Sequence, residues 1–381
     1  MAPRARIRVR ALLRRLHLWL GLTLGLLFAL LGVTGSALVF YPQIDALLHP
    51  ELRVEAVGQA PGWSSPVWDE ALATVRMRWP DKTGPWRFEV TGEASPIPAR
   101  YYDPPERAGR LFAPMMAWLS PDGREVLRRD YWGDYAMTWI YDLHMQLLAE
   151  ATGKQVVGWS GVAMLVLLVS GLAVWWPKAG WRKALVFKRD AVPTRRLRDI
   201  HKLAGLASLL LLLILVATGV LLALPVERDK ALAATLGPVA PLPAPDPLPG
   251  EGPPVSIARA LAAAHRAVPD ARLAWIETPG MAKNGGSGVY RFRVQVPGDP
   301  SRRFPHSYIF VDPRSAMVLA VHDIRRGNAA SAVNDWLHPL HDASIGGLAT
   351  RLLAVATGLA PLLLFVTGLL HWRRRTRARP R

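Results

Sequence analysis

The chain has 381 residues, of which 51% are hydrophobic, and it carries a formal net charge of +18 with no cysteine. Without cysteine, disulfides, cysteine-ligated iron–sulfur clusters, thiolate haem ligation and covalent C-x-x-C-H haem attachment are excluded. A strong positive charge often marks nucleic-acid binding, but here the charge follows the boundaries of long apolar runs.

Four long apolar runs predict transmembrane helices at 16–41, 151–177, 201–226 and 346–372. A bilayer core about 30 Å thick requires about 20 apolar residues in a helix. None of the runs shows the polar face that a surface helix of a soluble protein would carry. The first run is too long for the apolar part of a signal peptide, so we expect it to be retained. The fold class predicted is an α-helical membrane protein with a four-helix transmembrane bundle.

Arginines and lysines concentrate in three segments, at 1–15, 178–200 and 373–381. All three segments fall on one side of a four-span protein, and the positive-inside rule makes that side cytoplasmic. We therefore expect a multi-pass protein of the bacterial inner membrane with both termini in the cytoplasm. The charge then reports topology, so the surroundings expected are membrane lipid, with no nucleic-acid partner.

The two remaining segments, 42–150 and 227–345, face outward in this topology and are periplasmic in a Gram-negative cell. Each shows a helical pattern, then an alternating strand pattern, then a strand–turn–strand pattern. In chain order these are Pro66–Trp79, Arg87–Val90 and Ala117–Leu127, then Val255–Val268, Tyr290–Val296 and Tyr308–Val321. The proline-rich stretch Pro238–Pro254 is typical of an extended linker. We expect two small α+β domains.

The order of helix, outer segment and helix occurs twice, and its spacings agree. His17 and His201 each precede a Thr-Gly pair by 18 residues, counted to the glycine. His144 and His341 each precede a Ser-Gly or Thr-Gly pair by 27 residues, counted in the same way. The glycines are Gly35, Gly219, Gly171 and Gly368, respectively. This agreement predicts an internal twofold repeat.

The repeated histidines fall at the membrane boundaries. His17 and His201 lie at the cytoplasmic boundary, whereas His144 and His341 lie just before the second and fourth runs, at the outer boundary. Two imidazoles complete the axial coordination of haem iron. The sequence thus predicts two haems per chain, with iron held by His17 and His201 near one face and by His144 and His341 near the other. Contact with lipid headgroups is the alternative for any one histidine, but it does not explain the repetition.

Two further histidines compete with these ligands. His371 ends the fourth run outside the repeated pattern, and could replace an inner ligand or donate to a haem propionate. His338 lies three residues before His341, so both share a helix face, but its counterpart in the first half is Tyr141.

Small residues accompany the inner pair. Gly21 and Gly25 follow His17 at i+4 and i+8, and Gly205 follows His201 at i+4, on the same helix face. We interpret them as leaving room for a flat macrocycle beside its ligand. Close helix packing through small residues is the other interpretation.

Several stretches together resemble the PepSY-associated transmembrane helix family over nearly the whole chain, and the outer segments resemble PepSY domains. The stretches are Leu16–Gly21, Asp142–His144, Gly171–Pro177, Ile200–Gly205 and Leu340–Asp342. Some members are inner-membrane ferric-siderophore reductases, including a ferrioxamine-linked one. The resemblance implies two b-type haems, and electron transfer from the cytoplasmic side to a periplasmic ferric siderophore or other ferric chelate.

The short cytoplasmic segments contain no Gly-rich dinucleotide fingerprint. We therefore expect a separate electron donor, either a quinol or a cytoplasmic reductase. The alternative function is a haem-free PepSY membrane sensor or assembly factor that binds a periplasmic peptide or protein partner. A transporter subunit is disfavoured, because the helices carry no carboxylates suited to ion coupling.

Overall fold

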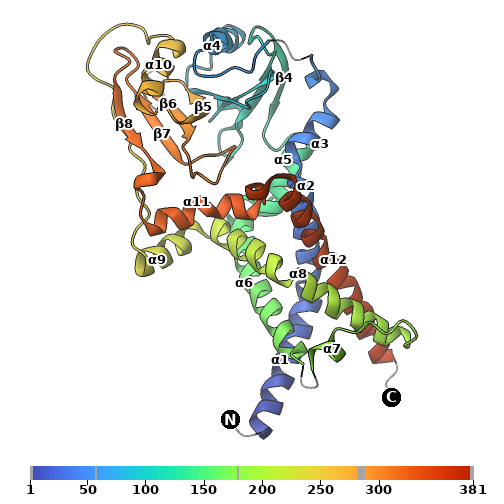
Figure 1. Ribbon diagram of the computed structural model, residues 1–381. Coiled ribbons are helices and arrows are strands. Elements are labelled where there is room, and N and C mark those ends of the chain that lie inside the picture. Colours follow the sequence, from blue (N-terminus) through green and yellow to red (C-terminus); the bar gives the residue numbers. More distant parts are fainter. Residues whose placement is uncertain (1–2, 56–57, 111, 178–179, 281–287, 378–381) are drawn as a thin grey trace. The chain divides into compact units, whose positions relative to one another are not determined.

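A computed structural model describes residues 3–55, 58–110, 112–177, 180–280 and 288–377. The chain divides into two compact units (Figure 1). The helical unit consists of Met1–Tyr41, Ile140–Arg228 and Leu337–Arg381, and the sheet unit consists of Pro42–Trp139 and Asp229–Trp336. The outermost parts of the predicted cytoplasmic ends, 1–2 and 378–381, lie outside the described residues.

The helical unit is built from long apolar helices. They are α1 (Pro3–Thr23), α2 (Gly25–Leu38), α6 (Glu150–Trp175), α8 (Pro193–Ala223) and α12 (Gly347–Arg377). Three of them, α6, α8 and α12, are long and apolar enough to cross a membrane, and α1 with α2 makes a fourth if the pair counts as one span. The four predicted apolar runs are thus confirmed as helices. Two extend beyond the prediction, because basic residues continue α8 at its start and α12 at its end.

The first span differs from the single straight helix expected at 16–41, because α1 and α2 meet at an angle of 60°. Sharp bends occur where glycines weaken the helix, and Gly21 and Gly25 flank this one. Beyond the bend α2 packs tightly on α12. A Cβ added at Gly32 would lie 2.1 Å from the carbonyl oxygen of Gly358, so the backbones touch there.

The spans form a closed ring in which α1 packs on α6, α6 on α8, α8 on α12, and α12 on α2. The first span and α8 are therefore diagonally opposite, as are α6 and α12. The centre of the ring is apolar and is filled by Phe28, Met164, Leu168, Leu212 and Ala360. This arrangement lets side chains from opposite helices approach one another.

Short helices lead into α6 and α12, where the sequence predicted only the ends of the outer segments. They are α5 (Ala136–Gln146) and α11 (Ala329–His341), and η4 (Ser344–Gly346) follows α11. The turn after α5 is sharp, since Leu147, Leu148 and Glu150 all have positive φ. Such backbone costs a non-glycine residue about 1–2 kcal/mol, so surrounding contacts must hold it. The other short helices are α7 (Trp181–Ala184) and α9 (Pro225–Thr235).

In the sheet unit, each segment has a helix directly before its four strands. The first segment contains α3 (Tyr41–Leu48), η1 (Pro50–Leu52), α4 (Val67–Arg78), β1 (Trp86–Glu89), β2 (Ile97–Tyr101), η2 (Pro105–Arg107), β3 (Met115–Leu119) and β4 (Val126–Tyr131). The second segment contains α10 (Ile257–Ala267), β5 (Arg272–Glu277), β6 (Tyr290–Gln295), β7 (Ser307–Val311), β8 (Val318–His322) and η3 (Ile324–Arg326).

The strands form one antiparallel sheet of eight strands in the order β4-β3-β2-β1-β5-β6-β7-β8. The junction is the pair β1–β5, in which Phe88 lies opposite Ile276. This differs from the two separate domains expected at 42–150 and 227–345. A four-stranded half would leave β1 or β5 as an open edge with unpaired backbone groups, and pairing the two edges removes both.

The two faces of the sheet have opposite character. One face carries Trp86, Phe88, Ile276, Tyr290 and Phe292, which are buried beneath α4 and α10 (Figure 1). Because side chains alternate along a strand, the intervening residues lie on the other face. Arginines, glutamates and aromatic residues occupy these positions.

The predicted helices and strands of both segments are confirmed to within a few residues, but β2 and β5 were not predicted. Pro98 lies within β2, and a proline in the sequence argues against a strand. The strand β5 is buried along nearly its whole length and contains an irregularity of register between Leu273 and Trp275, so it lacks the alternation that predicts a strand.

Candidate functional site

The structure brings the four repeated histidines together in two pairs. His17 on α1 and His201 on α8 have ring centroids 6.2 Å apart, with their planes perpendicular. His144 on α5 and His341 on α11 also have centroids 6.2 Å apart, with planes at 40°. Each pair joins opposite corners of the ring of helices, because α5 leads into α6 and α11 leads into α12.

The spacing within each pair fits two imidazoles that share one metal ion. A metal–imidazole nitrogen bond is about 2.0–2.1 Å long and the ring centre lies roughly 1.2 Å from the nitrogen, so two ligands in line place their centroids about 6.4 Å apart. Both pairs, at 6.2 Å, lie close to this value. Stacked or T-shaped aromatic rings also occur at 4.5–7 Å, so the distance needs support from the nitrogen atoms.

The Nδ1 atom of every paired histidine faces a hydroxyl or carbonyl oxygen. His17 Nδ1 lies 3.1 Å from the carbonyl oxygen of Leu167, and His341 Nδ1 lies 2.9 Å from that of Leu215. A serine or threonine hydroxyl stands beside each Nδ1 atom as well. The oxygens of Thr34, Ser170, Thr367 and Thr218 lie 3.1, 3.4, 3.1 and 3.2 Å from His144, His17, His201 and His341, respectively.

These contacts determine which nitrogen carries the proton. A carbonyl oxygen only accepts, so His17 and His341 must donate from Nδ1. Each hydroxyl gives its own proton to a carbonyl one turn earlier in its helix, as Thr34 does to Leu30 at 2.8 Å. The hydroxyl oxygen is then left to accept from Nδ1. The Nε2 lone pair remains available, as in metal-ligating histidines whose other nitrogen donates to protein oxygen.

A glycine lies against each imidazole ring. A Cβ added at Gly171, Gly35 or Gly219 would lie 2.8 Å from the Cε1 atom of His17, His144 or His341, and one at Gly368 would lie 3.3 Å from that of His201. These are the glycines that follow the four hydroxyl residues in sequence. Any larger residue would push the ring away, so each glycine and its hydroxyl neighbour fix one imidazole in place and orientation.

The glycines predicted to flank a macrocycle divide into two kinds. A Cβ at Gly21 would meet nothing nearer than Leu167 at 3.9 Å, and one at Gly205 would meet Leu364 at 3.6 Å. Both distances are ordinary van der Waals contacts, so protein packing does not require glycine there. Gly25 differs, because Phe365 covers it and would lie 2.5 Å from an added Cβ. Close packing accounts for Gly25, whereas room beside His17 and His201 remains the prediction for the other two.

The two competing histidines each contact an oxygen atom through Nδ1. His371 Nδ1 lies 3.1 Å from the carbonyl oxygen of Thr194, at the start of α8. His338 Nδ1 lies 3.2 Å from a carboxylate oxygen of Asp342, and its side chain is 39% exposed. Burial alone would raise the pKa of Asp342, but the hydrogen bond and charge of His338 and the bonds from Ser344 lower it below its usual value.

The role of the four hydroxyl residues was missed by sequence reasoning. The spacing counts used Thr34-Gly35 and its three counterparts only as markers of the repeat. The signal that was available is that a hydroxyl residue precedes the glycine in all four cases. Among the described residues, no group of three or more His, Cys, Asp or Glu gathers in a way that could hold a metal ion.

Comparison with known proteins gives one assignment. The family profile described as the PepSY-associated TM region matches residues 14–375. Among curated proteins, none matches this chain closely enough to count as a relative. The match extends across all four spans and both segments of the sheet unit.

Proposed function

The chain belongs to the family of the PepSY-associated TM region, and on that premise we propose that it is an inner-membrane reductase with two b-type haems. It would pass electrons from the cytoplasmic side to a periplasmic ferric siderophore or other ferric chelate, and release ferrous iron. The apolar helices and the family together make it a multi-pass membrane protein. The finer topology proposed has both termini in the cytoplasm and an internal twofold repeat.

The observation that carries this proposal is the pair of matched histidine contacts. Two imidazole pairs have the same centroid separation of 6.2 Å, and every member has an oxygen acceptor at Nδ1. Interfacial histidines that contact lipid headgroups would have no reason to meet in pairs inside a bundle. Nor would they share one hydrogen-bond pattern at four places.

Each residue has a definite task in this proposal. His17 and His201 would hold one haem iron through Nε2, and His144 and His341 would hold the other. The hydroxyls of Ser170, Thr367, Thr34 and Thr218 keep the proton on Nδ1, and the glycines that follow them set the position of each ring. Haem iron supplies reversible one-electron transfer, and two sites are needed because one cannot span about 30 Å of hydrocarbon.

The electron donor is proposed to be separate, either a quinol or a cytoplasmic reductase. On the outer side, the ferric chelate is the substrate. Reduction lowers the charge of its iron and weakens the hold of hard oxygen ligands. The chain would carry electrons from the donor to the ferric chelate through the two haem sites, which the four spans hold in place.

An absorption spectrum of the purified, dithionite-reduced protein tests the proposal directly. Sharp b-type bands with two haems per chain, measured by pyridine haemochrome assay, are the expected result. Protein produced with ample haem that contains none would refute the proposal. That outcome would favour the haem-free sensor or assembly factor.

The pairing has its own test. His144→Ala and His341→Ala are each expected to remove one haem, and the same one, while His17→Ala and His201→Ala remove the other. His338→Ala serves as the matched control for His341, because it lies one turn away and contacts Asp342. Loss of both haems in every variant, or loss in His338→Ala alone, would contradict the assignment.

A further inference from the structure

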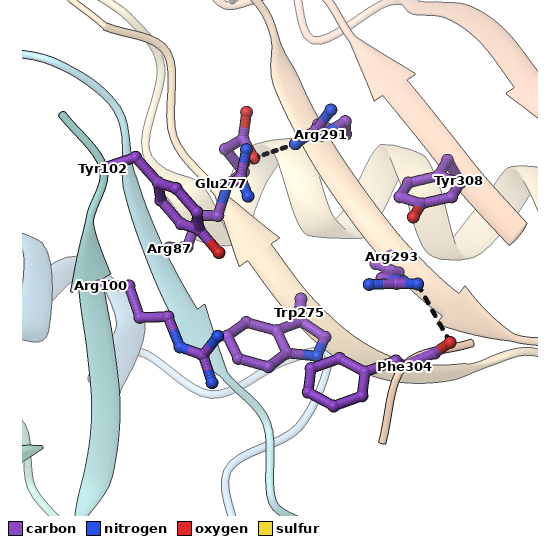
Figure 2. Close-up of a pocket in the computed structure, with 9 residues that line it drawn as sticks. All are labelled: Arg87, Arg100, Tyr102, Trp275, Glu277, Arg291, Arg293, Phe304 and Tyr308. Carbon is purple, nitrogen blue, oxygen red and sulfur yellow. Dashed lines mark hydrogen bonds and ion pairs between the residues drawn. The ribbon is translucent and has the colours of Figure 1, made fainter. Parts of the chain in front are cut away.

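The polar face of the sheet contains a pocket that the histidine pairs do not involve. It lies entirely within the sheet unit, has a volume of about 100 Å³, and is lined by four arginines, one glutamate and four aromatic residues (Figure 2). The lining residues are Arg87, Arg100, Tyr102, Trp275, Glu277, Arg291, Arg293, Phe304 and Tyr308. They come from both segments, so the pocket exists only because β1 pairs with β5.

Strand register arranges the charged residues in a row across the sheet. Arg100 lies opposite Arg87, Arg87 opposite Glu277, and Glu277 opposite Arg291. One carboxylate therefore stands among three guanidinium groups, and two of these are directly opposed like charges. Like charges at opposed positions destabilise a strand pair. The opposed arginines therefore lower the stability of the sheet when no ligand is bound.

The charges of the arginines are incompletely compensated. Glu277 forms ion pairs with both Arg87 and Arg291, so one carboxylate serves two cations. The nearest carboxylate oxygen to Arg100 is 3.8 Å away, on Glu89, which also pairs closely with Arg303. Arg100 is only 8% exposed, and its Nε–H is buried without a hydrogen-bond partner among the described residues.

Arg293 forms no ion pair with a carboxylate in the described part of the chain. Its guanidinium donates to the carbonyl oxygens of Phe304 and Pro305, the former at 3.0 Å (Figure 2). Burial lowers its pKa, and the nearby charges of Arg291 and Arg87 lower it further against the opposing effects of Tyr308 and Asp299. A guanidinium in such surroundings is stabilised by an anion.

Aromatic rings hold the guanidinium groups in place without neutralising them. Arg87 lies over Tyr102 at 3.9 Å from the ring centre, Arg100 over Trp275 at 4.7 Å, and Arg293 over Tyr308 at 5.2 Å. Burial would raise the pKa of Tyr102, but the charges and hydrogen bonds of Arg100 and Arg87 together outweigh burial and lower that pKa. The lining of the pocket therefore carries a net positive charge, with four arginines against one glutamate.

From the arginine row, the unpartnered Nε–H of Arg100 and the aromatic walls, we propose that this pocket binds a small polyanion that bears carboxylate or phosphate groups. Arginine forks bind both kinds of oxyanion by paired hydrogen bonds. The ligand would take the place of the missing carboxylates beside Arg100 and Arg293. The volume of the pocket limits the ligand to a compact molecule of the size of a tricarboxylate or a diphosphate. The site requires neither haem nor an electron donor.

Calorimetric titration of the full chain in detergent tests the proposal, with citrate and pyrophosphate as separate probes and putrescine as a cationic control. We expect saturable binding of at least one anion and none of putrescine. Arg100→Gln and Arg293→Gln should each weaken binding at least about tenfold, since hydrogen bonds to charged groups contribute about 1.5–3 kcal/mol. Arg259→Gln, at an exposed position on α10, should leave it unchanged.

The two probes separate the sources of the oxyanion. Binding of citrate alone assigns a carboxylate ligand, and binding of pyrophosphate alone assigns a phosphate ligand. Failure of both anions to bind would overturn the proposal, as would equal binding by the parent protein and both pocket variants. Calorimetry measures anion binding independently of haem. Failure to bind an anion therefore leaves the reductase proposal intact, and failure of the reductase proposal leaves the anion-binding proposal intact.

Discussion

Replacing Gly219 with alanine is the sharpest perturbation of the outer histidine pair. The added Cβ would lie 2.8 Å from Cε1 of His341, where ordinary contact begins near 3.4 Å. The ring must therefore retreat by about 0.6 Å, while a metal–ligand distance tolerates about 0.2 Å. We expect His341 to lose its grip on the iron while the helix itself persists, because alanine is favoured over glycine in a helix interior by about 1 kcal/mol.

The assay is the binding of carbon monoxide to the dithionite-reduced protein, followed by absorbance. A haem iron with two imidazole ligands has no free position, whereas one that has lost an imidazole binds carbon monoxide. Gly219→Ala should allow carbon monoxide to bind to one of the two haems. Gly171→Ala, which places a Cβ 2.8 Å from Cε1 of His17, should allow it to bind to the other. If folded Gly219→Ala protein binds no carbon monoxide at either haem, the contact with Gly219 does not determine the position of His341, and the prediction is wrong.

Three further predictions test other parts of the structure. An alanine at Gly21 or Gly205 would meet only ordinary protein contacts, so the fold should be unchanged. The added methyl group would occupy the room beside His17 and His201, so we expect the pyridine assay to show loss of the inner haem. Full retention of haem would show that neither glycine makes room for a macrocycle. Arg303 and Arg100 keep the pKa of Glu89 below its usual value despite burial, so Glu89 stabilises the fold above about pH 4.5 and loses this effect as pH falls. Arg303→Leu should therefore lower the free energy of unfolding by about 2 kcal/mol at pH 7, less than the loss of a fully buried ion pair because Arg303 is 37% exposed. The difference in unfolding midpoint between the parent protein and the variant should become smaller in acid. A difference that stays the same at all pH values would contradict this. Since the chain has no cysteine, single cysteines report topology cleanly: an impermeant maleimide should label Glu251→Cys in spheroplasts but Thr376→Cys only after lysis, and the reverse pattern would invert the proposed orientation.

The spans were predictable from sequence because length and hydropathy are local properties of each run. The bend at Leu24 was not, because the flanking glycines only permit a bend, and α12, on which α2 packs beyond it, is distant in sequence. Phe365 covers Gly25, and the backbone of Gly358 touches that of Gly32. Hydropathy reports that α2 is apolar and says nothing about which side of it meets α12.

The histidine pairs were predictable from sequence spacing, since equal intervals in the two halves of the chain place equivalent residues at the same level along the spans. The hydroxyl contacts did not follow, because Ser170 reaches His17 from another helix. The single sheet was also beyond sequence reasoning. Each segment predicts a helix and strands of its own, but the pairing of Phe88 with Ile276 joins segments separated by two spans.

Both candidate sites combine the two halves of the chain, in the same manner. Within a half, each imidazole takes its glycine and its hydroxyl from a neighbouring helix, as His17 does from Gly171 and Ser170. Its partner imidazole comes from the other half, and the arginine pocket likewise needs β1 and β2 from one segment and β5 to β7 from the other. Orientation of each ligand is therefore local, whereas the distance between paired ligands depends on packing between halves at α6–α8 and α2–α12. Substitutions at those two contacts should alter both histidine pairs together, while substitutions at a single glycine should alter only one.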